Sequence, residues 1–247
     1  MKRNPLVAIL SVLVLISLGS GGLWLLAAGR GTRAGSDAAL DEAIDLAAGY
    51  LARQCGKDGR FVYLANLDPN VPVADEYNIV RHAGAIYAMA ASEGRQSRPE
   101  SRQAMLRAVA FLKREGVAPV PGHEDLLAVW SRPEIDHVDE PVHANLGGAG
   151  VGLIALVSAE RVAPNTTPLE DLRRLAQFLV FMQEPTGNFF STYNPSRGGR
   201  TDAGRSLYYP GEAALGLVML YEYDPQPIWL DTAARAMAYL ARRRNLM

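Results

Sequence analysis

Three stretches of the chain are apolar on nearly every face of a helix, and each follows a more amphipathic stretch. They cover residues 77–93, 143–160 and 208–222. A helix without a polar face needs neighbours all round, so we expect these stretches to be buried inner helices. The amphipathic stretches carry apolar residues three and four positions apart on one side only. They are expected to be outer helices that cover the inner ones.

The outer helices are expected near residues 37–55, 98–114, 167–182 and 229–244. Ser36 or Asp37 is placed to cap the first of them. The run Thr167-Pro168-Leu169-Glu170 predicts a capping box with proline at the first helical position. Residues 117–141 are acidic and contain prolines, which predicts a long connection with a short helix at 123–130, and residues 194–206 predict a polar loop.

The helix pairs recur with one period. Aromatic–leucine pairs near the ends of the outer helices start at Tyr50, Phe111, Phe178 and Tyr239, which are 61, 67 and 61 residues apart. The inner helices end at Glu93, Glu160 and Glu222, which are 67 and 62 residues apart. Two landmarks with a shared spacing predict a helix-hairpin repeat. We therefore expect one all-α domain at 36–247, with repeats near 36–93, 98–160 and 167–223 and a partial repeat at 228–247.

The amino-terminal segment is uncharged and apolar from Leu6 to Ala28, after Lys2 and Arg3. A helix of about 23 residues spans roughly 34 Å, enough to cross a bilayer core, so residues 1–28 predict a transmembrane anchor. A cleaved signal sequence is the alternative. Basic residues before the run favour an inside amino terminus, which predicts a domain outside the cytoplasm after a linker at 29–35, either membrane-anchored or, after cleavage, secreted or periplasmic.

Composition excludes several classes of function. The formal net charge is −1 and the charges are mixed along the chain, so the basic stripe that nucleic-acid binding requires is missing. Cys55 is the only cysteine, which excludes an intrachain disulfide and a thiolate-rich zinc site. The sequence predicts no metal or cofactor.

Two junctions between helices share a pattern. They read Tyr50-x3-Gln54-x4-Gly59-x-Phe61 and Leu179-x3-Gln183-x3-Gly187-x-Phe189. This pattern resembles the QW motif of squalene and triterpene cyclases, whose superfamily includes protein prenyltransferase β subunits. The resemblance implies an α/α-toroid fold, here an incomplete barrel, in which the motif is structural. The DxDD signature of the cyclases and the Asp/Cys/His zinc set of the prenyltransferases are both missing from the sequence.

Polar residues collect near the starts of the predicted inner helices. If these helices point the same way, their first turns meet at one mouth of the repeat, where helix dipoles favour anionic groups. The candidate catalytic residues are Asp75, Glu76, His82, His143 and Glu212. The candidate substrate-binding residues are Tyr77, Asn78, Arg81, Asn145, Tyr193, Tyr208 and Tyr209. Carboxylates, histidines, an arginine and tyrosines are the groups used for acid–base chemistry and for binding carbohydrate.

Plainer roles are open for several of these residues. Asp75 suits a helix cap, and Glu212 suits a first-turn carboxylate stabilised by the helix dipole. Arg81 and His82 lie on an otherwise apolar helix, so a buried pair with Asp75 or Glu76 competes with a role in a site.

Three functions compete on the sequence alone. The first is a membrane-anchored domain that binds or processes a glycan-like polymer by acid–base chemistry at the mouth of the inner helices. The second is a non-catalytic repeat scaffold that binds a protein on its concave face. The third is a bowl that binds a terpenoid or another lipid, as the apolar inner helices and the QW-like junctions suggest.

Overall fold

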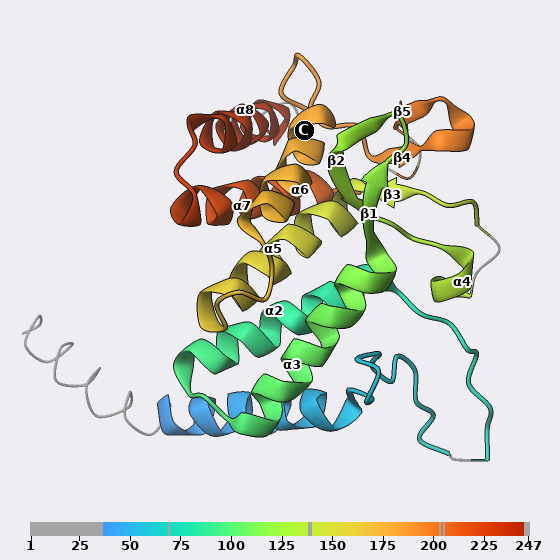
Figure 1. Ribbon diagram of the computed structural model, residues 1–247, viewed down its shortest axis with the longest axis vertical. Coiled ribbons are helices and arrows are strands. Elements are labelled where there is room, and N and C mark those ends of the chain that lie inside the picture. Colours follow the sequence, from blue (N-terminus) through green and yellow to red (C-terminus); the bar gives the residue numbers. More distant parts are fainter. Residues whose placement is uncertain (1–36, 69, 138–139, 203, 205, 245–247) are drawn as a thin grey trace, which may run out of the picture. The chain divides into compact units, whose positions relative to one another are not determined.

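The computed structural model describes residues 37–68, 70–137, 140–202, 204 and 206–244. The chain divides into two compact units, Met1–Ala47 and Ala48–Met247. The described part of the first unit, residues 37–47, is helical, and this helix continues to residue 54. All the elements labelled in Figure 1 belong to the second unit.

The three inner helices lie side by side in the order α2 (Ile79–Arg95), α5 (Leu146–Val162) and α7 (Tyr209–Tyr223) (Figure 1). The first turns of neighbouring helices touch one another, and so do their last turns. The three helices therefore point in the same direction. A Cβ added to Gly148 would lie 3.4 Å from the Val80 side chain, and one added to Gly150 would lie 2.8 Å from the Ala213 nitrogen. At the other end, Arg161 donates to the Met219 carbonyl oxygen at 2.7 Å.

The outer helices are α3 (Pro99–Phe111), α6 (Leu169–Phe181) and α8 (Pro227–Arg244). The contrast between the two sets follows the sequence pattern. Helix α6 buries one stripe that includes Leu172, Leu175 and Leu179, whereas α5 is buried on almost every face. The central position of α5, covered by α2 on one side and α7 on the other, is the reason that it carries no polar face.

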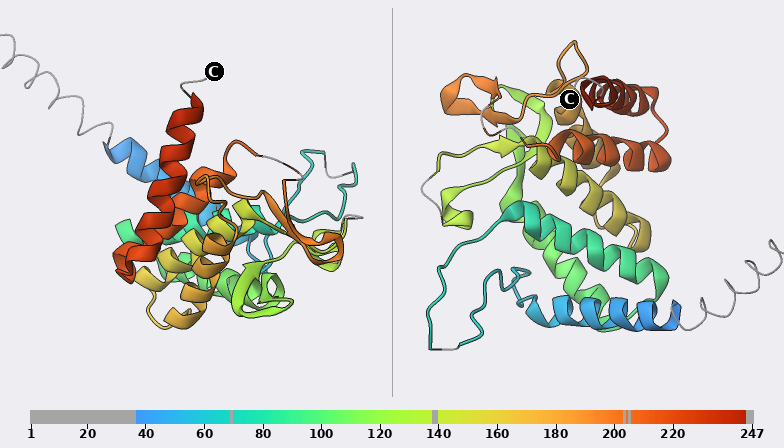
Figure 2. Two further views of the ribbon diagram at one scale, coloured as in Figure 1. Left: turned by 90° about the horizontal axis from the view of Figure 1, so that it is seen from above. Right: turned by 180° about the vertical axis from the view of Figure 1, so that it is seen from behind.

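Strands and long connections lie at the end of the inner helices where those helices begin (Figures 1 and 2). Strands β1 (Val117–Val120) and β2 (His123–Val129) form an antiparallel hairpin. A second, three-stranded sheet has the order β3 (Ala144–Asn145), β4 (Thr192–Asn194) and β5 (Gly199–Thr201). Short helical turns complete the connections: η1 (Leu112–Gly116), α4 (Pro133–Asp136) and η2 (Pro195–Arg197).

The predicted helix at 123–130 is therefore wrong, and the predicted loop at 194–206 contains a strand. Strand β2 begins just after Gly122, whose φ of 77° allows the chain to turn back on itself. The apolar run from Leu126 to Val129 is then buried by pairing with β1 instead of by helix formation. The sequence of a short apolar run is compatible with a helix or with a strand. Here the contact with β1 selects the strand.

The predicted capping box is also absent. Helix α6 is preceded by Pro168, which makes no side-chain cap, and the Thr167 N–H donates to Glu160 at 2.8 Å. Glu160 also accepts from the Asn165 N–H and the Thr166 hydroxyl. Hydrogen bonds to Glu160 at the end of α5 thus fix the chain before α6. The side chain of Thr167 does not cap that helix.

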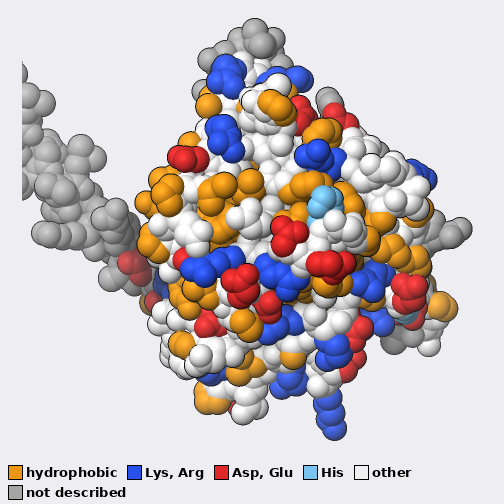
Figure 3. Space-filling model, turned by 45° about the horizontal axis from the view of Figure 1, so that its top comes forward, with side chains coloured by type: hydrophobic (Ala, Val, Ile, Leu, Met, Phe, Trp, Pro, Cys, Tyr) orange, Lys and Arg blue, Asp and Glu red, His pale blue; other side chains and the backbone are white. Residues whose placement is uncertain are grey.

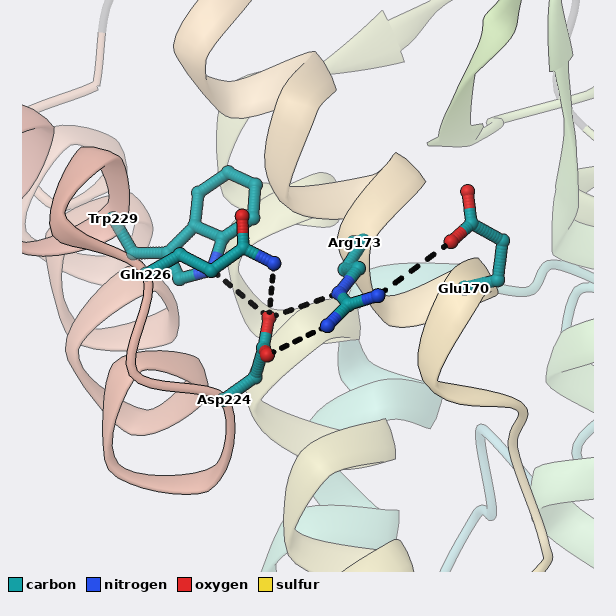
Figure 4. A network of polar contacts seen from close by, with 5 residues as sticks. All are labelled: Glu170, Arg173, Asp224, Gln226 and Trp229. Carbon is teal, nitrogen blue, oxygen red and sulfur yellow. Dashed lines mark hydrogen bonds and ion pairs between the residues drawn. The ribbon is translucent and has the colours of Figure 1, made fainter.

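The carboxylate at the end of each inner helix recurs in three dimensions. Glu93 and Glu160, which mark the predicted ends of the first two inner helices, are buried, but in the third repeat the buried carboxylate is Asp224 and not Glu222. Arg173 donates to both oxygens of Asp224, at 2.9 and 3.0 Å, and Gln226 and Trp229 donate to Oδ2 (Figure 4). The hydrogen bonds from Arg173 lower the pKa of Asp224. This network ties α6 to the turn between α7 and α8.

The two QW-like junctions are equivalent, with one correction to their alignment. Gln183 pairs through its backbone with Phe189, and the residue that pairs in the same way with Phe61 is Cys55 and not Gln54. Gln183 donates to the carbonyl oxygens of Gly187 and Thr232, at 3.2 and 2.9 Å. The Cys55 thiol contacts the matching carbonyl oxygens of Gly59 and Ala104, at 3.6 and 3.4 Å. A buried thiol therefore fills the position of the glutamine in the first repeat.

The predicted membrane segment, residues 6–28, lies outside the described residues, as do the predicted linker at 29–35 and the predicted cap Ser36. Within the described ranges, no helix has the length and apolar character to cross a bilayer.

Candidate functional site

Glu212 and Tyr209 lie in the first turn of α7 and face the first turn of α5. Glu212 is half-buried, and its Oε2 atom is enclosed without a hydrogen-bond partner among the described residues. A Cβ added to Gly147 would overlap the Tyr209 ring and come within 2.8 Å of this oxygen. Burial raises the pKa of Glu212. Gly147 therefore makes room for a carboxyl group that holds its proton more tightly than an exposed glutamate does.

Tyr209 and its neighbour Tyr208 differ in environment. Tyr208 is 75% exposed. The Tyr209 ring packs on the core, and burial followed by the charge of Glu212 raises the pKa of its hydroxyl. Tyr209 therefore keeps its proton. Its neutral hydroxyl group, beside Glu212, can form hydrogen bonds with a polar ligand.

His143 lies four residues before Gly147, at the start of the same segment. Its Nδ1–H donates to the Pro141 carbonyl oxygen at 2.9 Å. A carbonyl oxygen only accepts, so Nδ1 carries the hydrogen and the neutral ring keeps a free electron pair on Nε2. Backbone hydrogen bonds between His143 and Ser131 hold this segment in place. The imidazole can accept a proton at Nε2 without losing that support.

Asp136, at the end of α4, is a candidate that the sequence analysis missed. Its side chain is buried, and its Oδ1 atom has no hydrogen-bond partner among the described residues. Burial raises its pKa, against the opposing effects of Ser131, the Ile79 N–H and the nearby His143. The only signal in the sequence was an acidic residue in a long connection between prolines.

Three predicted binding residues have structural roles. The side chains of Asn78 and Asn145 are the N-caps of α2 and α5, and they accept from the N–H groups of Arg81 and Gly148 at 3.0 and 2.5 Å. Tyr193 is only 7% exposed, and its ring packs against those of Trp130, Phe178 and Phe181. Its ring belongs to the core and offers no surface for stacking a sugar.

Tyr77 and His82 form a buried chain of hydrogen bonds. His82 Nε2 lies 2.9 Å from the Ala108 carbonyl oxygen, so this nitrogen carries the hydrogen. Nδ1 then accepts from the Tyr77 hydroxyl at 2.7 Å, and that hydroxyl accepts from the Phe61 N–H at 3.0 Å. Burial raises the pKa of Tyr77 to about 12 and lowers that of His82 to about 4. His82 is thus a neutral core residue turned toward α3, and not a proton carrier at the mouth.

His82 is expected to make the fold sensitive to mild acid. Its folded-state pKa of about 4 lies below the unfolded value of about 6.5, so protons favour the unfolded chain. Its contribution is complete above pH 6.5 and falls as the pH drops toward 4. Between pH 7 and pH 5 we expect the free energy of unfolding to fall by about 2 kcal/mol.

Urea titrations of the wild type and of His82→Gln across this pH range measure the effect. The variant should lose most of the slope between pH 6.5 and 5. Glu93, Glu160 and Asp224, whose pKa values are lowered in the fold, contribute acid sensitivity only at lower pH. An unchanged slope in the variant would show that His82 does not titrate in this way.

The remaining predicted residues belong to the first repeat. Asp75 is exposed and lies 2.9 Å from His137 and 3.5 Å from Arg60, and Glu76 is exposed as well. Arg81 donates to the Tyr63 hydroxyl at 2.8 Å. Tyr209 and Glu212 therefore lie together against Gly147, four residues after His143, while Asp75, Glu76 and Arg81 line cavities elsewhere.

The surface carries both charges, and no metal cluster is evident. On the face shown in Figure 3, acidic and basic side chains are interspersed, with a histidine next to acidic groups and apolar side chains around them. Across the residues that the structure covers, no group of three or more His, Cys, Asp or Glu side chains is arranged to hold a metal ion.

This mostly helical fold is shared with α/α-toroid enzymes that process sugars. The chain resembles a GH76 α-mannanase from Bacteroides thetaiotaomicron, with a TM-score of 0.58 and 12% identity over 72% of this chain and 47% of the mannanase. It also resembles a D-mannose isomerase, with a TM-score of 0.62 and 12% identity over 81% of this chain and 50% of the isomerase. A sugar epimerase from a ruminal bacterium is similar with a TM-score of 0.61 and 13% identity, over 79% of this chain and 51% of the epimerase.

The chain thus spans about half the length of the solved structures that it resembles. No protein family profile matches it, and neither does any curated protein sequence. At these identities the likeness shows the fold alone. The neighbours are sugar-processing enzymes, and the resemblance to terpenoid cyclases and prenyltransferases is not shown by these structures.

Proposed function

We propose that this chain binds a sugar or glycan at the mouth of its inner helices and processes it by acid–base chemistry. The observation that carries the proposal is the half-buried carboxyl group of Glu212, with an unpaired oxygen and a raised pKa, at the meeting point of α5 and α7. Carboxyl groups of this kind serve as general acids. The sugar-processing enzymes that share the fold support the choice of ligand.

In this proposal Glu212 is the general acid and His143 the general base. A protonated Glu212 donates its proton to an oxygen of the sugar, and Nε2 of His143 accepts a proton from water or from the sugar. Both hydrolysis of a glycosidic bond and rearrangement of a sugar at its reducing end require one donor and one acceptor. We assign Tyr209, whose raised pKa keeps its hydroxyl group neutral, the role of hydrogen-bonding the ligand beside Glu212.

Tight packing at the mouth supports these roles. Gly147 leaves the space that the Glu212 carboxyl group and the Tyr209 ring fill, so both side chains have defined positions before a ligand binds. Two further parts of the proposal rest on the sequence alone. They are the location outside the cytoplasm and the attachment to a membrane through residues 6–28.

Incubation of the purified chain with mannobiose, cellobiose and mannose, followed by proton NMR, tests the proposal. We expect new anomeric signals from at least one sugar, and we expect His143→Ala to lose about 100-fold in rate because it removes the base. His123→Ala, which changes an exposed histidine packed on Phe181, is the matched control. Turnover of none of these sugars, or equal rates in both variants, would refute the assignment.

A further inference from the structure

The first repeat holds two adjoining cavities that the proposed acid–base site does not use. One has a volume of about 480 Å³ and the other of about 210 Å³. Both are lined by Gln54, Tyr77 and the segment Phe61–Tyr63. No residue of α5 or α7 lines either of them, so they are separate from Glu212 and His143. A volume of several hundred Å³ is typical of a small-molecule site.

Tyr63 forms part of both cavities and is held from two sides. Its ring packs edge-on against Tyr77, with 5.8 Å between the ring centroids. The Arg81 guanidinium lies 5.4 Å from the Tyr63 ring and donates to its hydroxyl at 2.8 Å. Tyr77 is in turn fixed by Phe61 and His82. An aromatic ring with so little freedom loses little entropy when a ligand stacks on it.

The larger cavity is lined by planar groups of both charges. Its charged residues are Arg53, Asp58, Arg60, Asp75 and Glu76. The Arg60 guanidinium lies over the Tyr77 ring at 4.6 Å and reaches Asp75 at 3.5 Å, a distance at which the pair is weak. The Asp75 side chain is 79% exposed, so its oxygens can accept further hydrogen bonds.

His137 fixes the position of Asp75. It has a left-handed backbone with a φ of 54°, at the end of α4, and its Nδ1 lies 2.7 Å from the Asp75 carbonyl oxygen and 2.9 Å from Asp75 Oδ2. A left-handed conformation is uncommon for a residue other than glycine, and these two contacts accompany it. The carboxylate at the edge of the cavity is therefore placed by a contact from another element.

The geometry points to a second saccharide-binding subsite in this cavity, one that binds sugar without reacting with it. Paired donors and acceptors next to an aromatic ring suit the hydroxyl groups and apolar faces of a hexose. Three carboxylates against two arginines favour a neutral sugar over an acidic one, because an anionic ligand would meet Asp58, Asp75 and Glu76. Tyr77 and His82 are committed to each other, which removes them from proton transfer.

This inference rests on the proposed function for its choice of a sugar ligand, but its test does not depend on turnover. We choose Glu212→Gln as the background, because it removes the proposed general acid and leaves the first repeat unchanged. Isothermal titration of this variant with cellobiose and mannobiose should show binding of at least one of them. Digalacturonate, which carries two carboxylates, should bind at least tenfold more weakly.

The double change Asp75→Asn and Glu76→Gln, in the same background, should weaken disaccharide binding by tenfold or more. Asp171→Asn is the matched control, since this carboxylate lines a different cavity between β1 and α6 and its loss should leave affinity unchanged. Absence of disaccharide binding, equal binding of digalacturonate, or full affinity in the double variant would each overturn the inference. Binding that the double change weakens, without turnover in the wild type, would uphold it and refute the acid–base proposal.

Discussion

Gly59→Ala is expected to destabilise the second unit by about 3 to 5 kcal/mol. Gly59 has a φ of 94°, and a Cβ there would overlap the carbonyl group of Arg107 and lie 2.9 Å from the Phe111 Cβ atom. The substitution therefore combines backbone strain with a clash against the backbone of α3, which cannot move as a flexible side chain can. Urea unfolding of the two proteins measures the difference.

Gly122→Ala is the matched control for this prediction. Gly122 also has a positive φ, 77°, but nothing lies within 4 Å of the position that a Cβ would take. We expect a loss of only about 1 to 2 kcal/mol from strain. At the equivalent junction, a Cβ added to Gly187 would lie 2.6 Å from the Arg235 carbonyl oxygen, so Gly187→Ala should resemble Gly59→Ala. Equal losses in Gly59→Ala and Gly122→Ala would contradict a close approach at the first junction.

Glu212→Gln is expected to reduce turnover of the sugar by about 100-fold or more while making the protein more stable at neutral pH. The loss of rate follows from removing a general acid, which contributes 10² to 10⁴ in rate. The gain in stability follows from the raised pKa of Glu212. The stabilising effect of its neutral form is complete below the unfolded pKa and is lost as the pH rises through the folded one. Glutamine stays neutral at every pH.

Melting curves of the wild type and of Glu212→Gln at pH 7 and pH 4 measure the expected gain in stability. We expect the variant to melt about 2 to 4 °C above the wild type at pH 7, which corresponds to about 1 kcal/mol, and at the same temperature at pH 4. Glu222→Gln is the control on the same helix, since Glu222 is exposed and pairs with Arg161. It should leave the rate unchanged. A variant Glu212→Gln with lower stability at pH 7 would show that the carboxylate is favourably bound.

The division into inner and outer helices was predictable because it depends on the number of neighbours that a helix has. The stretch at 143–160 is apolar all round, and α5 is enclosed on both sides. Local contacts were predicted less well. The thiol of Cys55 occupies the position that the sequence pattern gave to Gln54. The backbone pairing of Cys55 with Phe61 decides which residue stands at that position, and its side chain then contacts the Ala104 carbonyl oxygen.

The candidate site was predicted in part. Parallel inner helices bring Gly147, in the first turn of α5, next to Tyr209 and Glu212 in the first turn of α7, whereas the meeting of His143 with Glu212 stays a prediction. Asp136 was missed because a short helix in an irregular connection has no period to mark it. His82 was assigned to the mouth, yet it points toward α3, because nothing in the sequence names the Ala108 carbonyl oxygen as its partner.

The sequence by itself determined the repeated helix pairs, their period of about 64 residues and the helix ends at which polar groups gather, because these depend on hydrophobic periodicity and on residues close to one another in the chain. Only the tertiary structure decided which polar groups are enclosed, paired or free. Oε2 of Glu212 is enclosed beside Gly147 of another helix and has no partner among the described residues, and His82 is neutral because α3 covers it. Burial depends on contacts between residues distant in the chain, and burial sets the pKa values on which acid–base chemistry depends.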